Sequence, residues 1–541
     1  MSENIMDYFP LATPRDKQVA ALSAIQRVMD SKATSNIILE SPVGAGKSAM
    51  ALAITRYLGT GHIITTQKHL QNQYFEDFSE HLVTMKGRNS YPCIHEDYTG
   101  NYADEVRIKI RTGNYQDEVL MSCSDGKCLN CVTATDHKLV TDRCIDIFGG
   151  TGCPYLMAAD IAEASEVTVH NVHSFFYQTN FASKFSPRKS IVVDEAHDLD
   201  MVIRDILSES LKLPWAEEKD MFEDMPLQTL VKYLSGRLNL YSSMISMDNY
   251  ADPLEKERRL ASYREFLSNM MTRAAENSDC LVYAEHRSQS TTIMVKALDV
   301  RDRISTFLNT MGCHRLLMSG TLFNKQFVCD SMGLNPEETI FVRGTSEFPV
   351  DNRPVIYNKS VNADCSMSSW YKEAGVNKIV QSIKTLMDRH PNEKGFIHVG
   401  SYQEAEILGE ALQNTGRVIT HNPNDYQQVM EMFYASRAAV VLISPRSQQG
   451  VDMRDDRARF QIITKVPYLN IGDRVIQKMK SRSRLWYNLK TLTVFCQQLG
   501  RIVRSPTDHG VTYLLDSRFP RFLSSMWKYI PEWQQQAIRF L

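Results

Sequence analysis

Several features are missing from this sequence, and two of the absences exclude whole classes of protein. No run of about 18 apolar residues occurs, so we expect no membrane-spanning helix and no membrane partner. The first ten residues, MSENIMDYFP, lack an apolar stretch, so we expect no signal peptide and predict a cytoplasmic location. No low-complexity tract stands out. The composition, 43% hydrophobic and 23% charged, is that of an ordinary soluble globular protein, and 541 residues suggest about three or four structural units.

An excess of charge of one sign is also missing, since the formal net charge is only −2. Many nucleic-acid-binding proteins carry a basic excess. A neutral protein can nevertheless concentrate its positive charge in one groove. The net charge therefore neither supports nor excludes a nucleic-acid partner.

Cysteines are few outside one segment: of eleven, six lie between residues 93 and 153. In a chain without a secretion signal, such clustering favours a metal site over disulfides, or over unligated buried thiols. Residues 86–153 also have little apolar periodicity, so a metal that holds them together is plausible. Four thiolates suit either an iron–sulfur cluster or zinc, and the CxxC pair with its neighbours has zinc-like spacing. The six cysteines are Cys93, Cys123, Cys128, Cys131, Cys144 and Cys153.

The stretch IILESPVGAGKSAMA, residues 37–51, predicts a buried strand, a glycine-bearing loop and the start of a helix. Gly44 and Gly46 let the backbone N–H groups turn inward, Lys47 can reach the β- and γ-phosphates of a nucleotide, and the Ser48 hydroxyl can bind Mg²⁺. The full P-loop pattern begins with a glycine, which is Ser41 here. The alternative is an ordinary glycine-rich turn.

Apolar runs alternate with helical patterns over two regions of the chain, which predicts an α/β fold built on parallel sheets. Residues 201 to about 278 instead look almost wholly helical. A second alternating unit begins at about residue 350. The expected strands are 37–39, 61–66, one from 167, one from 190, 281–283, 292–295, 315–322, 395–399, 418–420, 439–443, 461–465 and 512–515.

Two acids follow the apolar strand at residue 190, in the run VVDEAH. Behind a phosphate loop, Asp194 would hold Mg²⁺ and Glu195 would orient the attacking water. The alternative is a helix N-cap.

Arg501 and Arg504, in QQLGRIVR, are three residues apart and would share one helix face, from which both could reach a γ-phosphate. A solvated basic helix end is the alternative. Two short polar loops, 319–321 and 449–452, follow apolar strands, where ligands of parallel sheets bind.

Residues 474–487, RVIQKMKSRSRLWY, form a basic run with aromatic residues. The run could track a phosphate backbone and stack bases. It could equally be a solvated helix face with Trp486 in the core.

Taken together and in this order, the motifs resemble those of the XPD/DinG family of superfamily 2 helicases. Gln449 is a departure, because the family commonly has Glu before Gly-Asp. The matching segments are Phe9-Pro10 with Arg15 and Gln18, residues 41–48, 65–67 with Leu70 and Gln73, 86–93, 153–155, 194–197, 319–322, 398–402, 449–452, 497–504 and 515–518.

The resemblance implies two RecA-like P-loop motor domains, with a cysteine-rich Fe–S insertion and a helical Arch insertion in the first. On that basis motor domain 1 comprises residues 1–85, 154–200 and 279–345, and motor domain 2 comprises 346–541. The Fe–S insertion would be 86–153 and the Arch 201–278.

The resemblance also implies ATP, Mg²⁺ and a [4Fe–4S] cluster as cofactors. Lys47, Asp194, Glu195, Arg501 and Arg504 would be catalytic, and Ser48 with Asp194 would hold Mg²⁺. The cluster ligands would be Cys93, Cys128, Cys131 and Cys153, although Cys123 or Cys144 could replace one of the middle pair. Nucleotide-binding positions would be Gln18, Ser41, Pro42, Val43, Gly44, Ala45, Gly46, Lys47, Ser48, Gly450, Asp452 and Gln497.

The expected activity is an ATP-dependent DNA helicase that moves 5′ to 3′ on single-stranded DNA and unwinds duplex junctions, with a repair or replication protein as a candidate partner. One alternative is a related motor that acts on RNA or remodels nucleoprotein. Another is a non-catalytic, zinc-stabilised nucleic-acid-binding scaffold.

Overall fold

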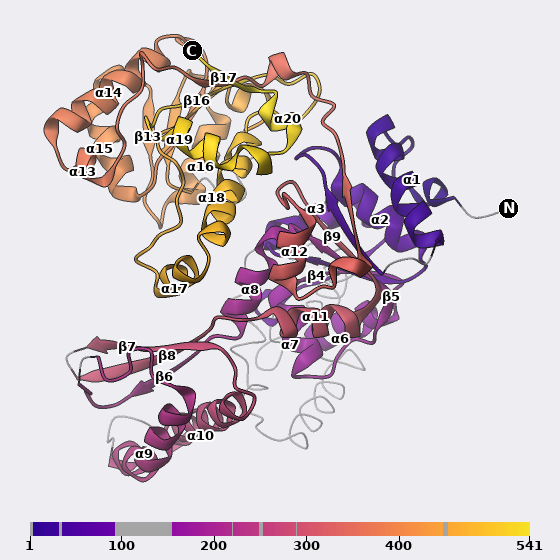
Figure 1. The fold of residues 1–541 in the computed structure, drawn as a ribbon, viewed down its shortest axis with the longest axis vertical. Coiled ribbons are helices and arrows are strands. Elements are labelled where there is room, and N and C mark those ends of the chain that lie inside the picture. The colour runs from indigo at the N-terminus through magenta and orange to yellow at the C-terminus, as the bar shows by residue number, and fades with distance from the viewer. Residues whose placement is uncertain are drawn as a thin grey trace, which may run out of the picture.

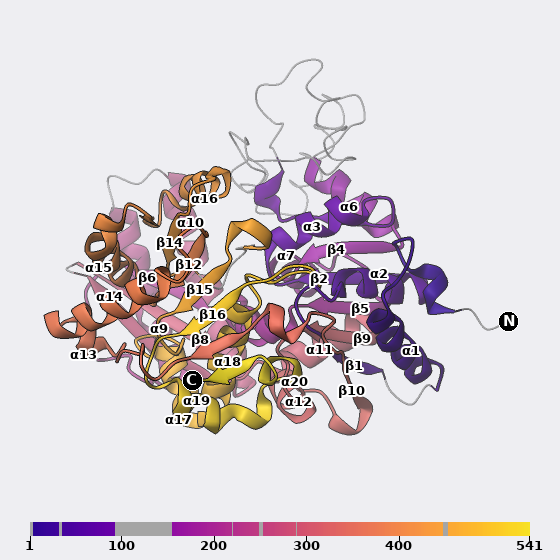
Figure 2. The ribbon, with the colours of Figure 1, turned by 90° about the horizontal axis from the view of Figure 1, so that it is seen from above.

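Two seven-stranded sheets form the centres of two α/β bodies that stand side by side (Figures 1 and 2). The computed structural model describes residues 4–31, 35–91, 154–218, 220–247, 253–287, 289–446 and 453–541. All strand pairings in the two sheets are parallel. The predicted α/β fold class with two parallel sheets is therefore confirmed.

The first sheet has the strand order β10-β1-β9-β5-β2-β4-β3. Its strands are β1 (Asn36–Glu40), β2 (Gly61–Thr65), β3 (Val83–Met85), β4 (Val167–Asn171), β5 (Arg188–Asp194), β9 (Gly312–Ser319) and β10 (Thr339–Arg343). Its helices are α1 (Asp16–Asp30), α2 (Lys47–Tyr57), α3 (Lys68–Phe78), α6 (Pro154–Ala164), α7 (Val172–Asn180), α8 (Leu199–Ile206), α11 (Arg301–Met311) and α12 (Lys325–Met332).

Both faces of this sheet are buried, which explains why its central strands are continuous apolar runs rather than alternating ones. Ile37 and Leu39 of β1 pack into a core with α1, α2 and α3, whereas Ile38 points into a second core with α7, α8, α11 and α12. Successive residues of a strand face opposite sides, so each apolar run supplies two cores at once.

The second sheet has the order β13-β14-β12-β15-β16-β11-β17. Its strands are β11 (Val355–Tyr357), β12 (Gly395–His398), β13 (Val418–Thr420), β14 (Val441–Ser444), β15 (Phe460–Ile463), β16 (Val511–Leu514) and β17 (Ile538–Phe540). Its helices are α13 (Met367–Trp370), α14 (Glu373–Met387), α15 (Tyr402–Leu412), α16 (Tyr426–Ala435), α17 (Arg474–Arg482), α18 (Arg484–Leu499), α19 (Phe519–Met526) and α20 (Glu532–Gln535).

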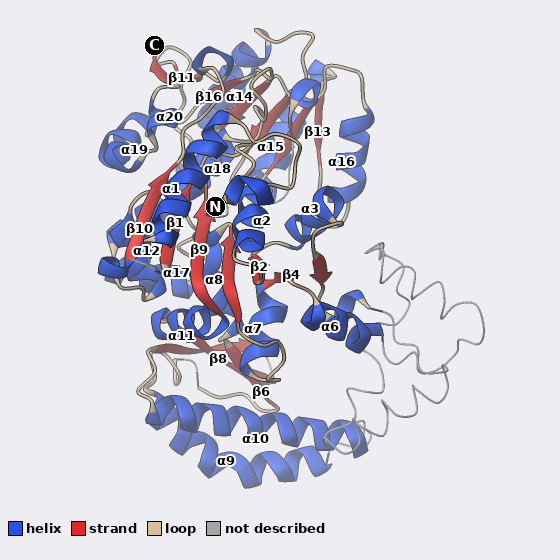
Figure 3. Cartoon of the chain, turned by 90° about the vertical axis from the view of Figure 1, so that its right-hand side faces the viewer, coloured by secondary structure: helices blue, strands red, loops and turns tan. Residues whose placement is uncertain are grey.

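A third, antiparallel sheet and two long helices project from the first body (Figures 1 and 3). The sheet has the order β6-β8-β7, with β6 (Glu209–Leu213), β7 (Cys280–Arg287) and β8 (Ser290–Ala297). Helices α9 (Leu227–Met247) and α10 (Pro253–Ala275) pack on it through one apolar core. We call residues 209–297 the projecting insertion.

The projecting insertion corrects two expectations from the sequence. Residues 201–278 were expected to be almost wholly helical, but they contain strand β6. The strands near 281 and 292 were placed with the first motor domain, whereas they pair with each other and with β6, away from the parallel sheet. Burial alternates along β8, as one expects of an antiparallel sheet that is covered on one face only.

Within the described ranges, no helix combines the length and apolar character that a membrane span requires.

Candidate nucleotide site between the two parallel sheets

The predicted phosphate loop joins β1 to α2 at the carboxyl end of the first sheet. Gly44 and Gly46 adopt left-handed conformations, with φ of 78° and 74°, which side chains disfavour. The buried Lys47 Nζ lies 3.4 Å from the carbonyl oxygen of Pro42 and 3.5 Å from that of Ser41, so its charge sits against the loop. Ser48 follows in the first turn of α2, whose N-terminus favours an anion.

Two residues at the N-terminal end of α1 hold this loop from the outside. Gln18 Nε2 donates to the carbonyl of Ala45 at 3.0 Å, and Arg15 Nη2 donates to that of Gly44 at 3.0 Å. Arg15 also pairs with Glu347 at 3.2 Å, in the segment that leads to the second sheet. These side chains line a recess beside the loop together with residues 344–348. No sequence motif pointed to residues 344–348.

Asp194 and Glu195 lie at the end of β5 beside the phosphate loop; Asp194 is buried, and the Glu195 side chain is 17% exposed. Burial, reinforced by the Glu195 carboxylate, raises the pKa of Asp194 to about 6. Burial also disfavours ionisation of Glu195, but Lys47 and His197 outweigh it and hold the pKa of Glu195 below its usual range. The two acids therefore have different proton affinities although they are adjacent.

A short polar network orients Glu195. Ser319 Oγ donates to Glu195 Oε2 at 2.9 Å, and His197 Nδ1 lies 2.7 Å from Ser319 Oγ and 3.2 Å from Glu195 Oε2. Burial disfavours protonation of His197, but the carboxylates of Asp198 and Glu195 outweigh it and raise its pKa to about 10. The loop 319–321, which was a weak indication in the sequence, thus contacts the acids directly.

Tyr74, on α3, is a site residue that the sequence analysis missed. Its buried hydroxyl donates to Asp194 Oδ2 at 3.1 Å and also hydrogen-bonds to the Ser48 side chain. Tyr74 therefore links the two residues predicted to hold Mg²⁺. The only available signal was general, since a buried tyrosine hydroxyl needs a partner.

The two arginines reach this region from the second body, but not from a helix. Helix α18 ends at Leu499, so the expectation of a shared helix face is wrong, and Arg501 and Arg504 lie in the loop that follows. This loop packs on the phosphate loop: a Cβ on Gly44 would lie 2.7 Å from the Arg504 carbonyl, and one on Gly500 would lie 3.1 Å from Val43. His69 on α3 is within electrostatic range of Arg501, Glu195 and Arg504.

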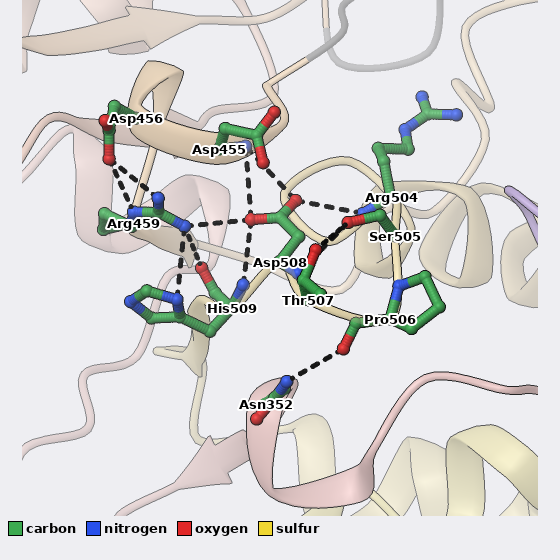
Figure 4. Close-up of polar contacts among 10 residues, drawn as sticks. All are labelled: Asn352, Asp455, Asp456, Arg459, Arg504, Ser505, Pro506, Thr507, Asp508 and His509. Atoms are coloured by element: carbon green, nitrogen blue, oxygen red, sulfur yellow. Dashed lines mark hydrogen bonds and ion pairs between the residues drawn. The ribbon is translucent and has the colours of Figure 1, made fainter.

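Asp508 binds the loop that carries Arg501 and Arg504, here called the arginine loop, and holds it on the body of the second sheet (Figure 4). Its carboxylate accepts hydrogen bonds from the backbone N–H groups of Arg504 at 3.1 Å and Asp455 at 3.2 Å, and from Arg459 Nη1 at 2.9 Å. The Arg504 side chain extends away from this cluster, so the backbone is fixed while the guanidinium projects elsewhere.

The basic run 474–487 forms α17 and the start of α18. Trp486 is buried, as expected if the run were a helix face with Trp486 in the core, and Tyr487 is buried as well. Three basic residues spaced four apart on α17 pair with acids of the projecting insertion: Arg474 with Glu223, Lys478 with Asp224 and Arg482 with Asp279.

Some predicted positions lie outside the described residues. They are Gln449, Gly450 and Asp452, and the cysteines Cys93, Cys123, Cys128, Cys131, Cys144 and Cys153. In the remaining parts of the chain, no three His, Cys, Asp or Glu side chains are grouped to hold a metal ion. This is compatible with Mg²⁺, which usually takes one or two carboxylates and fills its shell with phosphate and water.

The described site therefore combines a phosphate loop, two acids beside it and two arginines from another body. Such a set can bind a triphosphate, activate a water and stabilise charge on the transferred phosphoryl group.

Two family models match the chain. One, described as "Helicase C-terminal domain", covers residues 383–537. The other, described as "Type III restriction enzyme, res subunit", covers residues 11–212. The first match falls on the second sheet and the other on the first sheet and the phosphate loop.

Among curated proteins, the chain is 21% identical to "ATP-dependent DNA helicase YoaA" of Haemophilus influenzae, over 96% of this chain and 92% of that protein. It is 22% identical to "3'-5' exonuclease DinG" of Staphylococcus saprophyticus, but the aligned region spans only 45% of this chain and 28% of that protein.

Among solved structures, "XPD_Helicase" superposes with a TM-score of 0.59 at 15% identity, over 98% of this chain and all of that chain. "Structure of S. tokodaii Xpd4" gives a TM-score of 0.55 at 14% identity, with 97% and 100% covered. At this identity the structural likeness supports the fold alone.

Proposed function

We propose that this chain, which belongs to the XPD/DinG-like family of superfamily 2 helicases, is an ATP-dependent DNA helicase that moves 5′ to 3′ along single-stranded DNA. The observation that carries the proposal is the packing of the arginine loop of one body on the phosphate loop of the other. A nucleotide bound there would touch both bodies, so that its hydrolysis could change how they sit against each other.

In the proposed site, Lys47 and the backbone N–H groups of residues 43–48 bind the phosphates. Ser48 and Asp194 hold Mg²⁺, which neutralises charge on the phosphates. Glu195 orients the attacking water, and its low pKa keeps it ionised. Arg501 and Arg504 stabilise the charge that develops on the transferred phosphoryl group.

The nucleotide would also contact positions beyond the phosphate loop. Arg15 and Gln18 border the recess in which we place the nucleotide base. Gly450 and Asp452 are proposed, from the family resemblance, to line the same cleft, as is Gln497.

The phosphate loop and the acid are tested by separate variants. Lys47→Ala should lower ATP turnover about 100-fold or more, because it removes a cation that faces the phosphates. Glu195→Gln should still bind ATP but hydrolyse it poorly. The matched control is Lys189→Ala, an exposed lysine near the opposite end of β5 from Asp194. Near-normal turnover in Lys47→Ala, measured by phosphate release, would refute the assignment of the loop.

Polymer specificity and direction require their own assays on the intact chain. ATP turnover should rise on addition of single-stranded DNA, and duplexes with a 5′ overhang should be unwound in preference to those with a 3′ overhang. Stimulation by RNA alone would favour the RNA motor, and stimulation without unwinding would favour nucleoprotein remodelling.

We also propose that Cys93, Cys128, Cys131 and Cys153 hold a [4Fe–4S] cluster, which would act as a structural wedge where the duplex splits. The support is the clustering of six cysteines and the family resemblance. Protein purified without oxygen should be brown and contain about four iron atoms per chain. The Cys153→Ser variant should lose the brown colour, and it should lose unwinding activity before it loses ATP turnover. Colourless protein that contains zinc would refute the cluster.

The proposed domain division follows the family resemblance with one revision. Motor domain 1 would comprise 1–85, 154–200 and residues after β8 to 345, with the Fe–S insertion at 86–153, and motor domain 2 would comprise 346–541. The Arch would extend to the end of β8, because β7 and β8 pair with β6.

A further inference from the structure

One face of helix α18 contacts both segments that orient Glu195. Lys490 and Gln497 are seven residues apart on this helix, so their side chains leave it on the same side. Gln497 Nε2 lies 3.5 Å from Thr321 Oγ1, in the loop that also contains Ser319. Lys490 reaches the turn that follows Glu195. Through Lys490 and Gln497, the second body therefore makes two contacts with the polar network around Glu195. These contacts are separate from those of the two arginines.

Lys490 forms a buried ion pair across the two bodies. Its Nζ donates to Asp200 Oδ1 at 2.5 Å and to the carbonyl oxygen of His197 at 2.5 Å. The Lys490 side chain is 8% exposed and that of Asp200 is 3% exposed. Trp486 Nε1, one turn earlier on α18, lies 3.5 Å from the other oxygen of Asp200.

Such a pair contributes little net stability, because removing two charges from water offsets most of their attraction. Its geometry is specific, however, since a lone buried carboxylate or ammonium is strongly disfavoured. Docking of the two bodies in this register satisfies both charges. If the bodies separated, the ion pair would break and both charged groups would have to be hydrated again.

The contact point of Lys490 is close to the water-orienting acid. The His197 carbonyl that it binds belongs to the residue whose ring lies 3.2 Å from Glu195 and 2.7 Å from Ser319. Glu195 itself has a left-handed backbone, with φ of 53°, which is uncommon for a residue with a side chain. The turn therefore depends on its neighbours for its shape.

We propose that Lys490 is a positioning residue for ATP hydrolysis: by binding His197 and Asp200 from the second motor body, it orients Glu195 only when the two bodies are docked. The inference rests on the proposed function and deepens it. Hydrolysis is then confined to the closed arrangement, because the carboxylate that orients the water lacks its support in the open one. Arg501 and Arg504 stabilise charge on the transferred phosphoryl group, whereas Lys490 acts through the backbone of residues 194–197, the turn with the sequence DEAH.

The test compares Lys490→Met with Lys394→Met in the intact chain. Lys394 is a matched control: it is a buried lysine of the second body that donates to the Ser436 carbonyl at 3.0 Å, within that body. We expect Lys490→Met to lower kcat for ATP roughly 10- to 100-fold, since a small displacement of a catalytic group has effects of that size. The KM for ATP should change by less than about twofold, because the phosphate loop is untouched.

Further variants separate positioning from general destabilisation. Asp200→Asn should lower kcat to a similar extent, and the double variant should be no slower than either single one, because the pair acts as a unit. Lys490→Arg should recover part of the lost kcat, since it restores a cation and hydrogen-bond donors. Thermal melting should show that the variants remain folded at the assay temperature.

Outcomes that overturn the inference differ from those that overturn the function. If Lys490→Met and Lys394→Met have the same kcat, or if the double variant shows the product of the two single losses, Lys490 does not position the acid. If the unaltered chain hydrolyses no ATP, or if Lys47→Ala retains turnover, the proposed function itself fails.

Discussion

Single side chains outside the recognisable motifs hold the candidate site in shape. Tyr74 links Ser48 to Asp194, and Asp508 binds the backbone of the loop that carries the arginines. Each is a buried polar group with several partners, and such groups are costly to disrupt. At this scale the site is a set of supports around a few reactive groups.

Asp508 gives a prediction at the residue scale. Asp508→Asn should lower ATP turnover about tenfold, because an amide NH₂ would face donors that now meet a carboxylate oxygen, which displaces the loop of Arg504. It should also lower the free energy of unfolding by about 1–3 kcal/mol. Turnover and thermal melting measure the two effects.

The control is Asp456→Asn, since Asp456 also pairs with Arg459 but its side chain is 96% exposed, whereas that of Asp508 is fully buried. We expect this change to affect neither quantity measurably. Equal turnover in the two variants would show that the Asp508 contacts do not support the arginine loop.

Adjacent strands of the first sheet are joined by a buried histidine pair. His62 Nδ1 of β2 lies 3.3 Å from His170 Nε2 of β4, and His62 Nε2 lies 3.0 Å from the Ser186 carbonyl. Phe175 packs on both rings. Burial lowers the pKa of His62 to about 3 and lowers that of His170 well below its usual value. Both rings are therefore neutral in the folded protein.

The pair predicts an acid sensitivity at the scale of the elements. An unfolded chain binds protons at these histidines below about pH 6.5, whereas the folded chain does not until near pH 3 for His62. Stability from the pair is thus fully present above about pH 6.5 and is lost as the pH falls toward 3. Each histidine contributes a slope of up to about 1.4 kcal/mol per pH unit.

Denaturant unfolding between pH 7 and pH 5 measures this slope. His62→Gln should be less stable at pH 7 but should lose less stability on acidification than the unaltered chain. His286→Gln, at an exposed position on β7, serves as the control and should keep the original slope. An unchanged slope in His62→Gln would exclude the pair as its source.

At the scale of the whole molecule, the projecting insertion is held at both α/β bodies. The chain enters it from α8 and leaves it into α11, both of the first body, while α17 of the second body binds it through three ion pairs. The participating side chains are partly exposed, so each pair contributes at most about 1 kcal/mol and weakens with salt. The insertion can therefore follow one body and release the other.

The packing of the sheets in the whole molecule also explains which strands could be predicted from the sequence. The central strands of both parallel sheets, among them β1, β5 and β12, are apolar runs that feed two cores, and such runs stand out locally. Of the three-residue strands in these sheets, β13 was predicted but β3, β11 and β17 were not, since three residues carry little periodicity. Strand β10, at an edge of the first sheet, was also missed.

The sequence by itself determined the phosphate loop and the DEAH acids, because a strand, a tight turn and a reactive side chain are contiguous there and their chemistry is local. The tertiary structure alone decided which side chains support them. Tyr74, Asp508 and Lys490 meet their partners across 120, 53 and 290 residues of sequence, as in the Lys490–Asp200 pair. It also decided that the arginines leave from the end of α18 rather than from its face. Contacts of this range depend on how whole elements pack, and no local pattern records that packing.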